Sequence, residues 1–236
     1  MAAGLHSMPN NDFPLPIKAV MIDLDGTMLD TVADLAMAVN LMLTELGRAP
    51  LAEVEVRNFV GKGIPNLVGR ALTRAFDAEP GAALFERALP LYLDCYGRVN
   101  GKHTTMYPGV REGLDALRRA GFPLACVTNK SARFTLPLLK QMQLAEYFTV
   151  VVAGDTLPKK KPDPLPLTHA CKRLDIAPRD MLMIGDSLND TLAARAAGCP
   201  VFCVPYGYNE GLDVRDLDVD AIVETLFEAA KLVIRS

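Results

Sequence analysis

The sequence of 236 residues lacks several features that would assign it to whole classes of protein. No apolar run approaches the roughly 18 residues that a membrane-spanning helix needs, so no transmembrane helix is expected. Charge of neither sign is in large excess, because 25 Lys and Arg stand against 28 Asp and Glu, a formal net charge of -3. This balance argues against nucleic acid or an anionic membrane as the main partner.

Cysteine and histidine are also scarce. The five cysteines are odd in number, lie mostly in apolar stretches and form no CxxC pair, which predicts reduced, buried thiols in a cytoplasmic protein. The three histidines show no metal-ligand spacing. Residues 1–15 hold Gly, Ser, Asn, Asp and Pro and have no continuous apolar core, so we expect a flexible tail and not a signal peptide. Half of the residues are hydrophobic, enough to bury a proper core.

One apolar run ends abruptly in acidic residues. It begins at Ala19 and is followed by Asp23-Leu-Asp25-Gly-Thr27. Apolar runs bounded by turn residues are typical of buried strands, and open α/β folds bind ligands at the carboxyl ends of their strands. Alternate positions of a strand share one face, so Asp23 and Asp25 would lie side by side. Two such carboxylates repel unless a cation or a shared proton is present, which predicts a metal site, an acid–base pair, or both.

Further apolar runs alternate with amphipathic segments along the chain. Strands are expected at residues 123–127, 147–152, 181–184, 200–204 and 221–223. Helices are expected at residues 110–120, 134–143, 165–174 and 190–197. Strands that alternate with helices are typical of βαβ units, so the predicted fold class is α/β with a mostly parallel sheet.

Residues 31–105 interrupt this alternation. Residues 31–46 have the apolar spacing of an amphipathic helix, and residues 51–60, 64–76 and 82–96 continue in helical style. An insert that leaves the chain directly after the acidic loop would hang over that loop, which is the position of a lid. We therefore expect a catalytic core of residues 16–30 and 106–236 and an all-helical cap domain of residues 31–105.

Polar clusters lie at the ends of the predicted strands or shortly after them. They are Asp23 to Asp30, Thr128-Asn129-Lys130, Lys159 to Pro164, and Gly185 to Asp190. If the strands are parallel, all four clusters meet at one edge of the sheet. Carboxylates are the ligands that Mg²⁺ prefers, and lysine, threonine and backbone N–H groups bind phosphate oxygens. The clusters therefore predict a site for a phosphate and a divalent metal.

In order and spacing, these clusters resemble the motifs of the haloacid dehalogenase superfamily. The matching residues are Asp23-x-Asp25-Gly26-Thr27-x-x-Asp30, Thr128, Lys161-Pro162 and Gly185-Asp186-x-x-x-Asp190. The resemblance implies a Rossmann-like core with an inserted helical cap. Val60-Gly61-Lys62-Gly63 in the cap and several core segments further resemble bacterial phosphoglycolate phosphatases, although Lys62 stands where Asn is expected. That family implies Mg²⁺-dependent hydrolysis of 2-phosphoglycolate through an aspartyl-phosphate.

The resemblance also implies distinct catalytic roles. Asp23 would attack phosphorus as the nucleophile. Asp25 would act as general acid for the leaving alkoxide and then as general base for the hydrolytic water. Thr128 would hydrogen-bond the phosphoryl group, and Lys161 would balance the charge on the nucleophile and the phosphate.

Binding roles follow from the same resemblance. The implied ligands of Mg²⁺ are Asp23, Asp186 and, through its backbone carbonyl, Asp25, while Asp190 would be a further ligand or an acid that supports the ligands from behind. The implied substrate-binding residues are Thr27 and Asn129 in the core and Lys62 and Arg70 in the cap, where a cation would recognise the substrate carboxylate. The implied partner is a small phosphorylated molecule, bound by a monomer or a homodimer.

Other functions remain open on the same motifs. A phosphatase for another small sugar or organic phosphate, or a phosphomutase similar to β-phosphoglucomutase, would use the same two aspartates and differ in the cap. A haloacid dehalogenase would have no use for Asp25 or a metal cluster. A non-catalytic binding protein on this fold would have no use for the reactive side chains. An EF-hand loop that begins at Asp23 would need glycine at its sixth position, where this chain has Met28.

Overall fold

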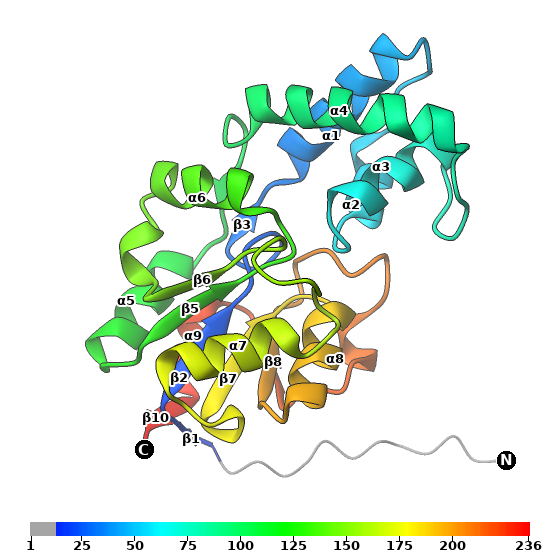
Figure 1. Cartoon of the computed structure of the whole chain (residues 1–236). Helices are drawn as coiled ribbons and strands as arrows, with labels where there is room; N and C mark the ends of the chain where they lie inside the picture. Colours follow the sequence, from blue (N-terminus) through cyan, green and yellow to red (C-terminus); the bar gives the residue numbers. More distant parts are fainter. Residues whose placement is uncertain (1–12) are drawn as a thin grey trace, which may run out of the picture.

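The computed structural model describes residues 13–236 (Figure 1). Most of the predicted tail, residues 1–12, therefore lies outside the described residues. Residues 13–15 lie against the core, because the rings of Phe13 and Phe202 are 5.8 Å apart and Leu15 begins a short strand. None of the helices in the described part of the chain is long and apolar enough to cross a membrane.

A six-stranded sheet forms the centre of the core. Its order is β6-β5-β2-β7-β8-β9, and every neighbouring pair is parallel. The strands are β2 (Ala19–Ile22), β5 (Leu124–Val127), β6 (Val150–Val152), β7 (Met181–Gly185), β8 (Val201–Cys203) and β9 (Ala221–Ile222). Each predicted strand is present, which confirms the α/β class. The first part of the segment 147–152 is different, because Tyr147 ends a 3-10 turn, η1 (Ala145–Tyr147).

Helices cover both faces of this sheet. The helices α5 (Val110–Arg119), α6 (Ala132–Gln141) and α9 (Leu226–Lys231) pack on one face, and α7 (Leu165–Leu174) and α8 (Leu188–Ala197) on the other. Side chains of a strand alternate between the faces, so Val20 and Ile22 join one buried cluster while Ala19 and Met21 join the other. The two clusters make a three-layered, doubly wound core.

Four helices form a separate layer over the carboxyl edge of the sheet (Figure 1). They are α1 (Val32–Glu45), α2 (Glu53–Phe59), α3 (Ile64–Thr73) and α4 (Ala82–Val99), each within three residues of its predicted ends. Packing of their apolar faces stabilises helices that are too short to persist alone. The cluster they bury also includes Phe134 of α6 and Tyr208 of a core loop, so the cap and the core share a packed contact.

Two short strands join the cap to the core. Strand β3 (Leu29–Asp30) pairs antiparallel with β4 (Thr105–Met106), so the chain leaves the core and re-enters it side by side. The Asp34 carboxylate at the start of α1 is fully buried and accepts four hydrogen bonds of 2.6–3.1 Å from residues 101–104. The Asp34 carboxylate therefore connects the segment that enters the cap with the segment that returns to the core.

Some elements carry little sequence signal. Strands β1 (Leu15–Ile17) and β10 (Val233–Arg235) pair parallel on the far side of the core, and neither was predicted; nor was α9. Three to six residues are too few to show a hydrophobic period. The prediction of buried thiols is confirmed, because all five cysteines are buried and free.

The order of the strands creates a crevice between β2 and β7. From β2 the chain adds β5 and β6 in one direction, and it then adds β7, β8 and β9 in the other. Open α/β sheets bind ligands at such a switch point, outside the carboxyl ends of the strands. Asp23 directly follows β2 and Asp186 directly follows β7, so both acids emerge at this crevice.

Candidate active site

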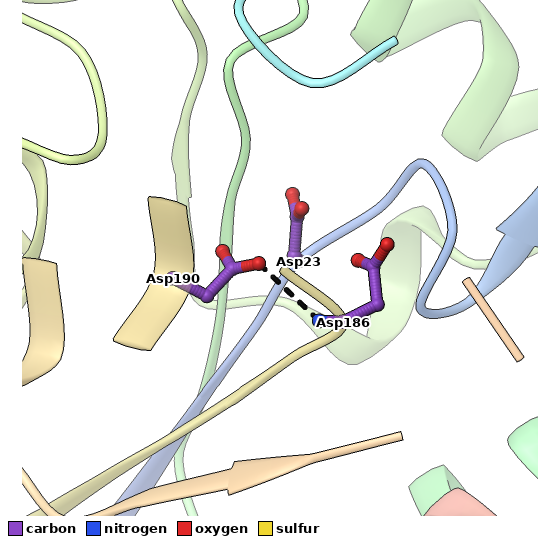
Figure 2. A group of neighbouring side chains, drawn as sticks. All are labelled: Asp23, Asp186 and Asp190. Carbon is purple, nitrogen blue, oxygen red and sulfur yellow. Dashed lines mark hydrogen bonds between the residues drawn. The ribbon is translucent and has the colours of Figure 1, made fainter. Parts of the chain in front are cut away.

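Three carboxylates converge at the crevice. Asp23, Asp186 and Asp190 each offer an oxygen, and these oxygens lie within 4.8 Å of one another (Figure 2). Asp190 lies in the first turn of α8, where its Oδ2 accepts the backbone N–H groups of Asp186 and Ser187 at 3.2 and 3.1 Å. The structure therefore brings together three of the four predicted metal ligands.

A single buried lysine faces two of these acids. The Nζ of Lys161 lies 3.0 Å from Asp23 Oδ1 and 2.6 Å from Asp190 Oδ1, and it also donates to the carbonyl of Val127 at 2.7 Å. Burial by itself lowers the pKa of Lys161, but the charges of Asp190 and Asp23 outweigh burial and hold this pKa above its ordinary value. Lys161 stays charged and offsets one of the three negative charges.

The remaining negative charge suits a divalent cation. Burial raises the pKa of Asp23 to about 7, with Lys161 acting in the opposite direction and Asp190 adding to the rise. Burial, followed by the charges of Asp190 and Asp23, raises the pKa of Asp186 well above its usual range. Raised pKa values mean that the protein alone places too little positive charge around these carboxylates. A hard cation such as Mg²⁺ or Ca²⁺, which binds oxygen ligands, would supply that charge. The residues present therefore fit a divalent metal.

The second aspartate of the first motif has different partners. Asp25 Oδ1 accepts the Thr31 hydroxyl at 2.7 Å and the Lys130 ammonium at 3.0 Å. Its carboxylate is not part of the three-acid group, and its predicted metal contact through the backbone carbonyl stays a prediction. Since Asp23 faces Lys161 and Asp25 faces Lys130, each of the two neighbouring acids has its own cation.

Lys130 also connects the core to the cap. Its Nζ donates to the hydroxyl of Tyr96 on α4 and lies 4.8 Å from the centre of that ring. Burial, with the charges of Asp25 and Asp34, raises the pKa of Tyr96 well above its usual value, so the phenol stays protonated. The sequence showed Lys130 in the second cluster without a role, and nothing in the sequence distinguishes Tyr96 from an ordinary core residue of an amphipathic helix.

Core and cap line one cavity of about 50 Å³. The core side contains both aspartates of the first motif, the three-acid group, Lys161 and residues 128–130. The cap contributes Leu35, Val60, Gly61, Gly63, Ile64, Leu67 and Tyr96. Every cap residue that lines the cavity is uncharged, and the volume suits a substrate with few atoms beyond its phosphate.

Of the predicted substrate-binding residues, Asn129 lines this cavity. Its side-chain amide donates to the carbonyls of Gly61 in the cap and Lys161 in the core, both at 2.9 Å. These two bonds set the orientation of the amide. The Oδ1 of Asn129 is buried and has no hydrogen-bond partner among residues 13–236.

Thr27 lies behind the acids and does not line the cavity. It is fully buried, and its hydroxyl donates to Asp186 Oδ1 at 2.6 Å. The backbone N–H of Tyr208 donates to the other oxygen of Asp186, also at 2.6 Å. Gly26 has a φ of +89°, and a side chain there would collide with the Asp186 carboxylate, so only glycine allows this turn. Thr27 thus orients Asp186.

The two predicted cap cations, Lys62 and Arg70, both face Glu210 of a core loop. Arg70 Nη1 lies 2.8 Å and Lys62 Nζ 3.2 Å from Glu210 Oε1. Arg70 is also buried and donates to the carbonyl of Phe59 at 3.2 Å. Neither cation is among the residues that line the cavity, so their substrate contact stays a prediction, and their observed contact joins the cap to the core.

Tyr208 makes a further core–cap contact, which the sequence did not predict. Its hydroxyl donates to Asp30 Oδ1 at 2.6 Å and accepts the backbone N–H of Thr31 at 2.7 Å. Arg57 of α2 pairs with Asp30 at 3.1 Å and lies 4.9 Å from the centre of the Tyr208 ring. The sequence of the segment 206–209 gives no sign of a contact with Asp30.

The comparisons with known proteins agree with this geometry. A family model described as haloacid dehalogenase-like hydrolase matches residues 20–204. The chain is 62% identical over 224 residues to a protein of Nitrosospira multiformis named phosphoglycolate phosphatase, covering 95% of this chain and 99% of the relative. It is 54% identical, with the same coverage, to one of that name from Thiobacillus denitrificans. The chain belongs to the haloacid dehalogenase-like hydrolases.

Solved structures show the same fold. A crystal structure described as a predicted phosphoglycolate phosphatase from Haemophilus somnus is 30% identical to this chain, with a TM-score of 0.84, and the match covers 92% of this chain and 97% of that one. A putative phosphoglycolate phosphatase from Lactobacillus delbrueckii matches with a TM-score of 0.85 at 24% identity, covering 93% of this chain and 99% of the other, and supports the fold alone.

Proposed function

We propose that this chain hydrolyses 2-phosphoglycolate to glycolate and phosphate. The observation that carries the proposal is the full-length similarity to relatives named phosphoglycolate phosphatase, together with a site of the kind that phosphoryl transfer needs. The cavity of about 50 Å³ supports a small phosphate ester. The charge of the substrate would be met by a metal, by Lys161 and by the hydroxyl of Thr128, which also lines the cavity.

The first step of the proposed reaction uses both aspartates of the first motif. Both interactions of the Asp23 carboxylate fall on Oδ1, with the Leu24 amide at 2.7 Å and with Lys161 at 3.0 Å. This leaves Oδ2 to attack phosphorus and form an aspartyl-phosphate. Asp25 gives a proton to the leaving ester oxygen, and in the second step it takes a proton from the attacking water.

The proposed metal is Mg²⁺, held by Asp23, Asp186, Asp190 and the backbone carbonyl of Asp25. Like those of Asp186, both oxygens of Asp190 also have partners within the protein, since Oδ1 accepts Lys161 and Oδ2 accepts the amides at the start of α8. Asp190 therefore holds Lys161 and the metal-binding loop in place. When bound, a divalent metal reduces the repulsion between the anionic nucleophile and the anionic substrate.

A panel of small phosphate esters tests the substrate. It compares kcat/KM for 2-phosphoglycolate, ethyl phosphate, glycerol phosphate and β-glucose 1-phosphate, each with Mg²⁺ and with EDTA. We expect 2-phosphoglycolate to be preferred and EDTA to abolish hydrolysis. A preference for another ester would reassign the substrate, and conversion of β-glucose 1-phosphate to glucose 6-phosphate would indicate a phosphomutase. Unchanged rates in EDTA would contradict the metal.

The nucleophile has a separate test. Asp23→Asn should abolish turnover and prevent a burst of covalent phosphate on the protein in rapid-quench experiments. The matched control is Asp94→Asn, since the Asp94 side chain is 74% exposed on α4 and, among residues 13–236, forms an ion pair with Arg98 alone. Substantial turnover by Asp23→Asn, or a phosphoprotein that still forms, would remove Asp23 from this role.

A further inference from the structure

The cavity between core and cap is lined by two cations, and only one of them has a role in the steps above. The residues that line it include Lys130 and Lys161 but no arginine. Lys161 is fully engaged by Asp23, Asp190 and the carbonyl of Val127. Lys130 is equally buried, with 3% of its side chain exposed, and it is the cation nearest to the proton-transferring Asp25.

Lys130 and Tyr96 together have two donors to spare. An ammonium group has three N–H donors. Two of them meet Asp25 Oδ1 and the Tyr96 hydroxyl, and no third acceptor exists among residues 13–236. The Tyr96 hydroxyl accepts from Lys130, and its own proton has no acceptor in the described part of the chain. One ammonium N–H and one phenol O–H therefore remain for a ligand in the cavity.

The position of this pair matches the chemistry of the proposed substrate. Asp25 must reach the ester oxygen that leaves, and the carboxylate of 2-phosphoglycolate begins two bonds from that oxygen. Lys130 Nζ lies 3.0 Å from Asp25 Oδ1, so a group that extends past Asp25 comes within reach of Lys130. We propose that Lys130 and Tyr96 form the carboxylate-binding pair that selects 2-phosphoglycolate, an inference that rests on the proposed function.

This assignment differs from the one that the sequence suggests. Lys62 and Arg70 were expected to recognise the carboxylate from the cap, but both face Glu210 and neither lines the cavity. Tyr96 comes from the cap and Lys130 from the core, so the pair is complete only when the two domains meet as they do here. Carboxylate binding would thus favour the closed cap.

The test compares two esters that differ in the carboxylate. Ethyl phosphate has the same ester oxygen and first carbon as 2-phosphoglycolate but ends in a methyl group. The measured quantity is the selectivity ratio, kcat/KM for 2-phosphoglycolate divided by kcat/KM for ethyl phosphate. Four variants are measured with Mg²⁺: Lys130→Met, Tyr96→Phe, the rival Lys62→Met, and the control Lys159→Met. Lys159 is exposed and pairs with Asp163.

Lys130→Met should lower the selectivity ratio by about 30-fold or more, because it removes a buried, charged hydrogen-bond partner of the carboxylate. The kcat/KM for ethyl phosphate also falls, through the loss of the contact with Asp25, but by less. Tyr96→Phe should lower the ratio about 3- to 10-fold while leaving the Lys130–Asp25 pair in place. Lys159→Met should keep the ratio of the unmodified protein.

Three outcomes would overturn the assignment. If Lys130→Met and Tyr96→Phe each lower kcat/KM for the two esters by equal factors, the pair of Lys130 and Tyr96 supports Asp25 and does not bind the carboxylate. If Lys62→Met collapses the ratio, the carboxylate is bound from the cap loop. A ratio near one in the unmodified protein would instead refute the proposed substrate together with this inference. If Lys130→Met does not fold, as judged by thermal unfolding, the Tyr96→Phe variant decides. An equal loss for both esters would overturn the assignment, and a larger loss for 2-phosphoglycolate would support it.

Discussion

The same carboxylate that we propose as nucleophile should weaken the metal-free protein at neutral pH. Burial raises the pKa of Asp23 to about 7 from an ordinary value of 3.8. The folded state therefore binds this proton more tightly than the unfolded state does. The contribution to stability is complete below about pH 4, declines as the pH rises towards about 7, and stays lost above it.

The Asp23→Asn variant isolates this effect. Asparagine has the size of a protonated aspartic acid, and its carbonyl oxygen can still accept the Leu24 amide and Lys161. The pKa of Asp23 rises from 3.8 to about 7, and each pKa unit corresponds to about 1.4 kcal/mol. Ionisation of Asp23 therefore lowers the free energy of unfolding by at most about 4 kcal/mol. In EDTA, the variant should exceed the unmodified protein in free energy of unfolding by about 1 kcal/mol at pH 4.5 and by up to about 4 kcal/mol at pH 8.

Urea unfolding at several pH values, with EDTA and with Mg²⁺, measures the difference. Mg²⁺ should stabilise the unmodified protein more at pH 8 than at pH 5, because metal binding displaces protons from its ligands. It should stabilise Asp23→Asn far less, so the advantage of the variant shrinks or reverses. Parallel pH profiles for the two proteins in EDTA would refute the reasoning, because they would show that Asp23 titrates alike in the folded and unfolded states.

Three further predictions concern charged side chains in or near the contact between core and cap. Asp34→Ala should cost about 3–5 kcal/mol in urea unfolding, because it leaves the backbone N–H groups of Gly101, His103 and Thr104 and the Thr104 hydroxyl without their acceptor. A loss below about 1 kcal/mol would contradict this. Glu210→Gln should raise KM for 2-phosphoglycolate about 5- to 30-fold, since it weakens the closed cap by about 1–2 kcal/mol; an unchanged KM would show that this contact does not hold the cap. Lys161→Met should lower the single-turnover rate about 10²- to 10³-fold with Mg²⁺ present, and a smaller loss would mean that the metal alone balances the phosphate charge.

Buried elements were predictable from the sequence, and their edges were less so. Strands such as β7 (Met181–Gly185) are buried on both faces, so they appear as continuous apolar runs, and helices such as α7 (Leu165–Leu174) show a clear apolar stripe. Strands β3 and β4 have two residues each and are defined by pairing across the helical insert of residues 31–104, which local sequence cannot reveal.

The sequence likewise predicted some contacts of the candidate site and missed others. The acids at positions 23, 186 and 190 were predictable as neighbours, because parallel strands deliver their following residues to one edge. Thr27 was assigned to the substrate from its motif, but the turn at Gly26 directs its hydroxyl to Asp186. Tyr208 was unassigned, because its contacts with Asp30 and Thr31 join residues more than 170 positions apart.

By itself the sequence determined the α/β class, the position of the helical insert and the reactive residues at the strand ends, because each depends on local hydrophobic pattern and strand order. Only the tertiary structure decided which charges face one another. Lys62 and Arg70 had the right charge for a substrate carboxylate, but Glu210 faces both of them, whereas Lys130 meets Asp25 and Tyr96 inside the cavity. Such pairings depend on the angle at which the cap meets the core, and that angle is set by packing between segments far apart in the chain.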